Sequence, residues 1–228
     1  MVEKKFFACK RKSTNRSYKY YSLLSLYTIL FLFLITGTIS ENKERILTGE
    51  TSEIHLVIEG TGGEQQIIYD GYTGSSPSEC LVEGNTVTCS KTCNIGSAGT
   101  DYNVVLKFPS GMASCFQMFK DINKIKEIDF SNFDFSSVNN IGYMLEGCTS
   151  LTSVNFGTNI LHFTSIGGIF KGCSNLISAD LSKFDISGVK TLEKLFDGCT
   201  NLESVNFGNI DTSTVESMFA LLDRKSVV

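Results

Sequence analysis

The chain has 228 residues, with 20 Lys or Arg against 24 Asp or Glu for a formal net charge of −4, and 42% of its residues are hydrophobic. The charge is uneven: residues 41–222 hold 22 Asp or Glu and 11 Lys or Arg, so this part carries −11. So acidic a segment argues against nucleic acid and anionic lipid as partners, because both carry negative charge themselves.

The first 40 residues combine a basic stretch with an apolar one. Residues 1–19 hold seven Lys or Arg and one Glu, and residues 20–40 are uncharged and include the run LLSLYTILFLFLI. Small residues near Ser40 suit signal peptidase, so the pattern predicts a secretory signal peptide. The run is also long enough to span a bilayer as an uncleaved signal anchor, and only in that case is the membrane a partner. Both alternatives place the rest of the chain outside the cell, either secreted or at the cell surface.

Residues 41–111 read as a small β-rich cap or a separate β-domain. Short β-like runs such as EIHLVIEG and NVVLKF alternate with clusters of Gly, Ser and Pro. Three cysteines lie here: Cys80, Cys89 and Cys93. Because export leads to an oxidising compartment, we expect one disulfide among them, with three pairings open and one cysteine left over.

Residues 112–222 contain an internal repeat. An apolar residue precedes x-Gly-Cys at Leu145, Phe170 and Phe196, and the same register continues to Phe119 and Leu222. The steps are 26, 25, 26 and 26 residues by subtraction, within the roughly 20–29 residues of leucine-rich repeats.

Each repeat predicts a strand followed by a short helix. Alternating runs such as SVNF suggest a strand, and apolar spacing in VKTLEKLF suggests one or two helical turns. Ser136, Ser187 and Ser213 are candidate helix N-caps, and the Gly of each Gly-Cys pair is expected to end the helix in a left-handed conformation. The predicted fold class is therefore α/β: a leucine-rich-repeat-type solenoid with a strand plus a short helix per coil of about 26 residues, preceded by the small β-rich cap or domain.

The cysteines of the repeats are expected to form a buried column. Stacked repeats align four positions, here called the cysteine ladder: Ile122, Cys148, Cys173 and Cys199. Because Ile122 shows that the position accepts an aliphatic residue, the ladder predicts small core side chains, and disulfides between neighbours are the alternative.

The outward positions of the predicted strands also align. We call the following ten residues the polar face: Glu127, Asp129, Ser131, Ser153, Asn155, Ser178, Asp180, Ser182, Ser204 and Asn206. Repeat proteins commonly bind partners along such a surface. The alternative is that the polar face is only solvated and that its Asn and Asp side chains bond along the stack.

No set of residues indicates catalysis. The chain has two histidines, His55 and His162, and no Cys–His pair, Gly-rich phosphate loop or metal-ligand spacing is visible in the sequence. The sequence therefore predicts a protein that is not an enzyme and uses no cofactor or metal.

The last six residues, 223–228, break the repeat. Where the register calls for Gly-Cys, the chain has Arg224-Lys225. DRKSVV is also the translation of a common sequencing-adapter string, so these residues are expected to be an artefact, with further repeats continuing in the natural protein. The solenoid over 112–222 would then be incomplete at its C-terminus.

The runs LEGCTSLTSVNF, FKGCSNLISADLSKFDISGV and FDGCTNLESVNFGNIDTSTVESM resemble the repeats of BspA-type leucine-rich repeat surface proteins, a DUF285-like group, over about residues 112–222. The resemblance implies a secreted or cell-surface protein, in some members one that adheres to host matrix or cells. We therefore expect a binding or adhesion module that recognises an extracellular protein or glycan. The alternatives are a structural surface-coat protein, or a fragment of a larger exported protein whose active domain is missing.

Overall fold

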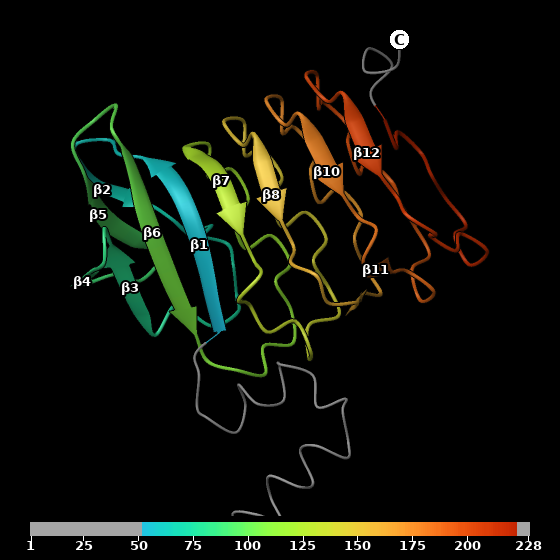
Figure 1. The fold of residues 1–228 in the computed structure, drawn as a ribbon, viewed down its shortest axis with the longest axis horizontal. Coiled ribbons are helices and arrows are strands. Elements are labelled where there is room, and N and C mark those ends of the chain that lie inside the picture. The colour runs from blue at the N-terminus through green and yellow to red at the C-terminus, as the bar shows by residue number, and fades with distance from the viewer. Residues whose placement is uncertain (1–51, 223–228) are drawn as a thin grey trace, which may run out of the picture. The chain divides into compact units, whose positions relative to one another are not determined.

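The computed structural model describes residues 52–222, which belong to one compact unit and contain twelve β-strands (Figure 1). The expected signal peptide or signal anchor over residues 1–40 and the expected artefact over residues 223–228 lie outside this range. The strands are β1 (Ser52–Glu59), β2 (Gly63–Gln66), β3 (Glu79–Val82), β4 (Asn85–Val87), β5 (Thr92–Gly96), β6 (Asp101–Phe108), β7 (Ile125–Asp129), β8 (Ser153–Asn155), β9 (Leu161–His162), β10 (Ser178–Asp180), β11 (Phe184–Asp185) and β12 (Ser204–Asn206).

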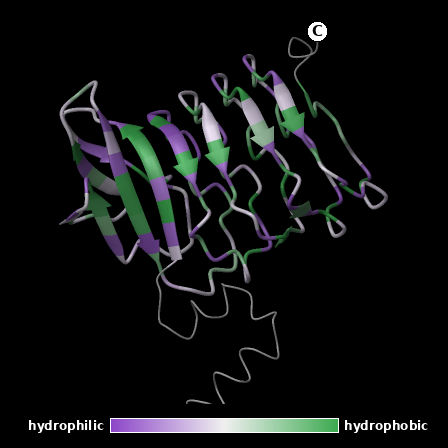
Figure 2. Cartoon of the chain, viewed as in Figure 1, coloured by the Kyte–Doolittle hydropathy of each residue, from purple (hydrophilic) through white to green (hydrophobic). Residues whose placement is uncertain are grey.

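A six-stranded sheet in the order β4-β3-β6-β1-β7-β8 joins the N-terminal segment to the repeats. β1 forms because its residues alternate between buried and half-buried positions, and it pairs antiparallel with β6 on one side and β7 on the other. Hydrophobic and hydrophilic residues both occur along β1 and β6 (Figure 2). The predicted β-rich segment and the first repeat thus share one sheet.

Successive repeats pair in parallel. β7 pairs with β8 and β10 pairs with β12, each pair joining residues 26 positions apart, and β9 pairs with β11 on another side of the repeats. No strand pairing joins β8 to β10, although the Ile177 amide donates to the Thr152 carbonyl at 3.4 Å. β7, β8, β10 and β12 follow one another in a row (Figure 1).

The predicted α/β class is wrong, because residues 52–222 form no helix and are all-β. The solenoid of alternating strands and helices therefore does not occur. The segment VKTLEKLF (residues 189–196), which was predicted as a helix, and the equivalent segments of the other repeats consist instead of turns, irregular backbone and isolated bridge residues. This part of the chain accordingly has no helix long and apolar enough to cross a bilayer.

The backbone of these segments explains the difference. The Tyr143 amide donates to the Gly167 carbonyl of the next repeat at 2.9 Å, whereas a helix would direct it to the carbonyl four residues earlier. Tyr143 and Gly147 also have φ values of 54° and 74°, which an α-helix does not accommodate. The apolar spacing nevertheless resembles that of a helix, since the buried hydrophobic residues between positions 141 and 148 are Ile141, Met144, Leu145 and Cys148.

The Gly of each Gly-Cys pair has the expected left-handed conformation without ending a helix. φ is 74° at Gly147, 74° at Gly172 and 79° at Gly198, and Asp121 adopts 60° at the same position of the first repeat. A Cβ atom added to Gly198 would lie 3.3 Å from the Gly172 Cα, so the column also needs close contact between backbones.

The expected N-caps are also wrong, because there is no helix for Ser136, Ser187 or Ser213 to cap. Each of these serines donates its backbone N–H to the aspartate two residues earlier, at 2.8–3.0 Å. The Asp-x-Ser motif thus forms a side-chain-capped turn, which competes with helix initiation.

The core runs through all repeats and combines aliphatic and aromatic side chains. Phe130 stacks on Phe156 with centroids 5.3 Å apart, and Phe170 stacks on Phe196 at 5.3 Å. The alternating apolar positions of the repeats predict that eight residues lie in this core. Five of them are buried, namely Leu151, Phe156, Leu176, Leu181 and Leu202. Three are only half-buried, namely Val154 in β8, which borders a groove, and Val205 and Phe207 at the last described strand.

Candidate functional site

The polar face lies on the outward side of the repeat strands. Strand register places Glu127 opposite Ser153 and Asp129 opposite Asn155. In the second pair of strands, Ser178 and Asp180 are opposite their equivalents in β12, Ser204 and Asn206. Of the ten residues, Asp129 and Ser182 are half-buried and the other eight are exposed.

The Asn and Asp side chains of this face are held by their own turns. The Asp129 Oδ1 accepts the Ser131 backbone N–H at 2.7 Å, and the Asn155 Oδ1 accepts the Gly157 N–H at 2.9 Å. The equivalent bonds to Asp180 and Asn206 measure 2.8 and 3.0 Å. Fixed side chains lose less entropy when a ligand binds, so these oxygens are pre-organised acceptors.

Hydrogen bonding also keeps Asp180 charged. The Ser182 hydroxyl and backbone N–H, with the Asn206 side chain, lower the pKa of the Asp180 carboxyl below its ordinary value, and they outweigh a smaller opposing effect of burial. The polar face therefore presents a carboxylate among neutral amides and hydroxyls at neutral pH.

The face continues onto the N-terminal strands. Pairing of β1 with β7 sets His55 opposite Asp129 and Val57 opposite Glu127. A shallow groove of about 250 Å³ follows this junction, lined by β1, β6, β7 and β8. The sequence placed His55 in the β-like run EIHLVIEG, but no sequence signal indicated that β1 lies beside the first repeat.

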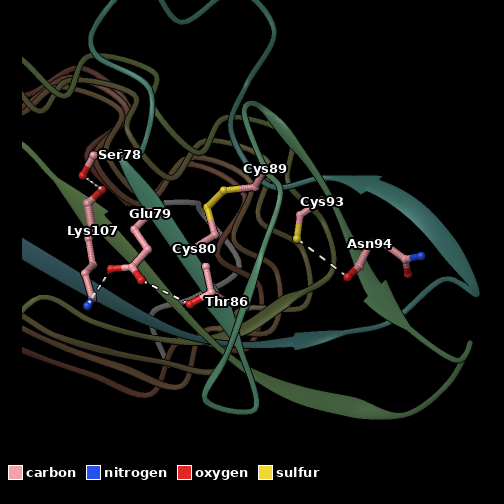
Figure 3. The surroundings of a disulfide bond; sticks show 8 residues. All are labelled: Ser78, Glu79, Cys80, Thr86, Cys89, Cys93, Asn94 and Lys107. Atoms are coloured by element: carbon pink, nitrogen blue, oxygen red, sulfur yellow. Dashed lines mark hydrogen bonds and ion pairs between the residues drawn. A yellow bond between two sulfur atoms is a disulfide. The ribbon is translucent and has the colours of Figure 1, made fainter.

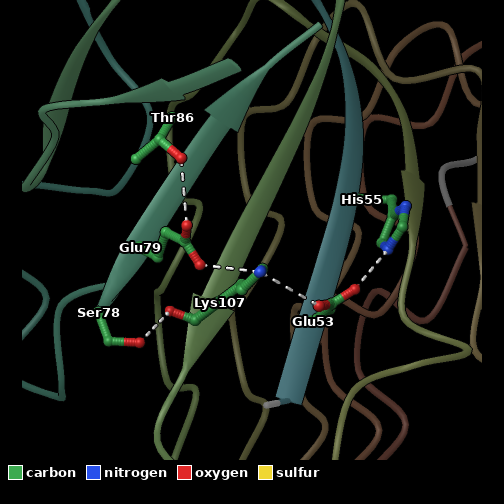
Figure 4. A network of polar contacts seen from close by, with 6 residues as sticks. All are labelled: Glu53, His55, Ser78, Glu79, Thr86 and Lys107. Carbon is green, nitrogen blue, oxygen red and sulfur yellow. Dashed lines mark hydrogen bonds and ion pairs between the residues drawn. The ribbon is translucent and has the colours of Figure 1, made fainter. Parts of the chain in front are cut away.

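A network of charged groups borders the groove (Figure 4). Lys107 on β6 contacts Glu79 on β3 at 2.8 Å and Glu53 on β1 at 3.9 Å, and Glu53 also contacts the His55 Nε2 at 3.3 Å. The hydrogen bond from Lys107 lowers the Glu79 pKa, and the Thr86 hydroxyl supports it with a weaker effect. These pairs are partly exposed, so they contribute little to stability and mainly orient the side chains beside the groove.

The second histidine, His162, belongs to a different side of the repeats. Its Nδ1 lies 2.6 Å from the Asp185 Oδ2, between β9 and β11. Hydrogen bonds from the Ser187 backbone and hydroxyl, followed by the one with His162, lower the Asp185 pKa. Within residues 52–222, no group of three or more His, Cys, Asp or Glu side chains is placed to hold a metal ion.

The three cysteines of the β-rich N-terminal segment comprise one disulfide pair and one free thiol (Figure 3). Cys80 and Cys89 form a disulfide, with Cα atoms 6.1 Å apart, and Cys93 is a buried free thiol beside them. Burial raises the Cys93 pKa above its ordinary value, which disfavours the reactive thiolate.

The cysteine ladder is buried in all four repeats, as Ile122 is 3% exposed and the three cysteines are fully buried. Each thiol donates to a carbonyl of the preceding repeat: Cys148 to Phe119, Cys173 to Leu145 and Cys199 to Phe170, at 3.0–3.1 Å. The cysteines of the ladder therefore donate hydrogen bonds to buried carbonyl groups in addition to packing in the core. The sequence did not reveal these hydrogen bonds.

Comparison with known proteins gives one finding. Residues 112–227 match the model of a family described as Mycoplasma protein of unknown function, DUF285. No curated protein and no solved structure matches the chain. The matched region takes in all of the described repeats and their polar face.

Proposed function

Because the chain belongs to the DUF285 family, whose function is unknown, we propose that it is an exported, non-catalytic binding protein that contacts an extracellular protein or glycan through its polar face. The resemblance of its repeats to those of BspA-type surface proteins, some of which take part in adhesion, supports the proposal. The basic and then apolar pattern of residues 1–40 supports export.

The observation that carries the proposal is the order of the polar face. The side-chain oxygens of Asp129, Asn155, Asp180 and Asn206 recur in register, and each of these four accepts a backbone N–H two residues later. Serine hydroxyls recur beside them on the same strands, at Ser153, Ser178 and Ser204. A row of fixed acceptors and adjacent hydroxyls suits a ligand with repeated hydrogen-bonding groups, such as a glycan or an extended polypeptide.

The binding test compares arginine variants of the full chain. Ser178→Arg and Ser204→Arg place a large side chain on the polar face, whereas Ser137→Arg places it at an exposed turn elsewhere in the repeats. Binding to immobilised extracellular proteins and glycans is measured for each variant. The proposal expects that both face variants lose binding and that Ser137→Arg keeps it. Equal binding by all three, or no binding by the parent chain, would contradict it.

Export is tested separately by expressing the full chain with an epitope tag after residue 222. The tag is expected in the medium or accessible to protease on intact cells. Recovery of the tag only from the cytoplasm would exclude an extracellular role whatever the purified chain binds in vitro.

A further inference from the structure

A second cavity lies away from the polar face, between the loop of residues 71–75 and the start of the first repeat, residues 111–117. It measures about 540 Å³, within the roughly 300–1,000 Å³ of pockets that hold small ligands. We propose that this cavity is a binding site for a neutral saccharide. This site is separate from the polar face, and its occupancy does not depend on the proposed function of that face.

A hydrogen bond joins the two walls of the cavity, and further bonds beside it fix the loop. The Tyr72 hydroxyl donates to the Ser114 carbonyl at 3.1 Å, and the Tyr69 amide donates to the Met118 carbonyl at 2.9 Å. Lys91 donates its ammonium group to the Tyr72 carbonyl at 2.8 Å and also to the Asp70 carbonyl. Because these bonds exist without a ligand, binding requires little ordering of the loop.

Packing around Tyr72 explains the glycine in this loop. The Tyr72 ring is 4% exposed, and a Cβ atom on Gly74 would lie 2.1 Å from its hydroxyl oxygen. Any side chain at position 74 would therefore push the ring away from Ser114. Glycine at position 74 leaves room for the Tyr72 ring and so preserves this wall of the cavity.

The lining of the cavity is uncharged. It combines hydroxyl and amide side chains with exposed loop backbone, and it contains no Asp, Glu, Lys, Arg or His. Gln117 and Asn140 supply amide groups. Asn140 uses its Oδ1 to accept the Gly142 backbone N–H at 3.0 Å, and among residues 52–222 its Nδ2 has no hydrogen-bond acceptor, so it is available to donate to a ligand.

One aromatic ring borders these groups. Phe116 is 40% exposed, and its ring is held edge-to-face against Tyr143 with centroids 6.1 Å apart. An exposed ring presents a face of negative quadrupole, which attracts the weakly positive C–H groups on one face of a pyranose. The nearby amides and hydroxyls match the sugar hydroxyls.

This combination selects against other ligand classes. An ionic ligand would lose hydration without gaining an opposite charge in the pocket. A purely apolar ligand would leave the Asn140 and Gln117 amides without partners. A neutral saccharide can place its C–H groups against the Phe116 ring and form hydrogen bonds from its hydroxyls to the Asn140 and Gln117 amides.

The repeat provides a matched control for the test. Phe219 occupies the position of Phe116 in the last described repeat and is also exposed, at 69%, but it does not line the cavity. Phe116→Ala and Phe219→Ala in the full chain therefore remove the same side chain from equivalent turns. Thr73→Trp, at an exposed loop position, fills the cavity without removing any core contact.

Binding is measured by saturation-transfer NMR with the methyl glycosides of glucose, galactose, mannose and N-acetylglucosamine. We expect saturation transfer to at least one glycoside, about five- to tenfold weaker binding by Phe116→Ala, unchanged binding by Phe219→Ala and loss of binding by Thr73→Trp. No transfer to any glycoside would overturn the inference. So would equal binding by Phe116→Ala and the parent chain, or unimpaired binding by a folded Thr73→Trp variant.

Discussion

The side-chain amide of Asn155 donates to the carboxylate of Asp129, one repeat earlier, at 3.1 Å. Each of these two residues also caps its own turn, through the backbone N–H of Gly157 or Ser131. The Asn155 and Asp129 side chains therefore have two roles: they are available to a ligand on the polar face, and they join neighbouring repeats. A substitution there is expected to affect both stability and binding.

Asn155→Ala tests this link through stability. It removes the bond to Asp129 and the cap of Gly157, and because the site is exposed we expect a loss of about 1 kcal/mol in the free energy of unfolding. Ser153→Ala, two residues earlier on the same exposed side of β8, is the control, with an expected change within about 0.5 kcal/mol. Urea denaturation measures both. An equal effect of the two substitutions would show that the Asn155 bonds do not stabilise the stack.

Leu176→Ala tests the core of the repeats. Leu176 is fully buried, so its truncation leaves a cavity and is expected to cost about 2–5 kcal/mol. Its neighbour Ile177 is 47% exposed, and Ile177→Ala is expected to cost much less. Thermal or urea unfolding of the two variants compares them directly. A Leu176→Ala variant as stable as Ile177→Ala would contradict the observed packing.

Glu146 joins three successive repeats. Its carboxylate contacts the ammonium groups of Lys120 at 2.8 Å and Lys171 at 2.6 Å. Burial alone would raise the Glu146 pKa, but hydrogen bonds from both lysines outweigh it and hold the pKa below its ordinary value of 4.5. A carboxylate with a pKa lowered by folding stabilises the folded state above its unfolded pKa, and that contribution is lost as pH falls through the folded pKa.

Glu146→Gln should therefore reduce stability at neutral pH, by roughly 1–3 kcal/mol. The difference from the parent chain should begin to shrink as pH falls below about 4.5, where the carboxylate of the unfolded chain becomes protonated, and should be lost as pH falls through the lower pKa of the folded state. Glu203→Gln, at an exposed position outside the network, is the control. A difference between Glu146→Gln and the parent that stays constant from pH 7 to about pH 3 would contradict the ion-pair explanation.

The cysteines differ in chemical accessibility. Burial raises the pKa of the Cys115 thiol to about 12, and it also raises the pKa of the Cys148 and Cys173 thiols well above their ordinary value. Iodoacetamide is therefore expected to label these three thiols only after denaturation, without added reductant, and peptide mapping should find Cys80 linked to Cys89. Labelling of Cys173 in the native chain, or a disulfide that includes it, would disprove this assignment.

The buried position of the cysteine ladder predicts which side chains it can accommodate. Cys173→Ile is expected to be better tolerated than Cys173→Asp, because Ile122 already occupies the equivalent position and a buried unpaired carboxylate is costly. Both variants lose the thiol bond to the Leu145 carbonyl, so the loss of that bond does not account for a difference in stability between them. Greater stability of the aspartate variant would contradict the buried position of the ladder.

The repeat register and much of the core were predictable from the sequence, because both depend on the recurrence of apolar residues. The strand columns Glu127/Ser153 and Ser178/Ser204 follow from the same recurrence and are paired in the structure. The helices were not predictable in this way. The apolar spacing around Leu145 fits a helix and a run of turns equally well. Backbone hydrogen bonds to the next repeat favour the turns, and these bonds cannot be read from the sequence.

Long-range pairing accounts for what the sequence missed at the candidate site. Nothing local to EIHLVIEG indicates that β1 pairs with β7, so neither the position of His55 beside Asp129 nor the groove between them could be expected. The cavity proposed to bind a saccharide likewise depends on the hydrogen bond from Tyr72 to Ser114, 42 residues later in the chain. Such contacts arise from tertiary packing, which periodicity and motif spacing do not encode.

The most direct measurement is hydrogen–deuterium exchange of the full chain with and without an extracellular partner that it binds. If the polar face is the binding surface, amides in β8, β10 and β12 should exchange more slowly in the complex, while the turn around Ser137 exchanges as before. Protection confined to segments outside the polar face, or no protection in these strands at saturating partner, would contradict the proposed function.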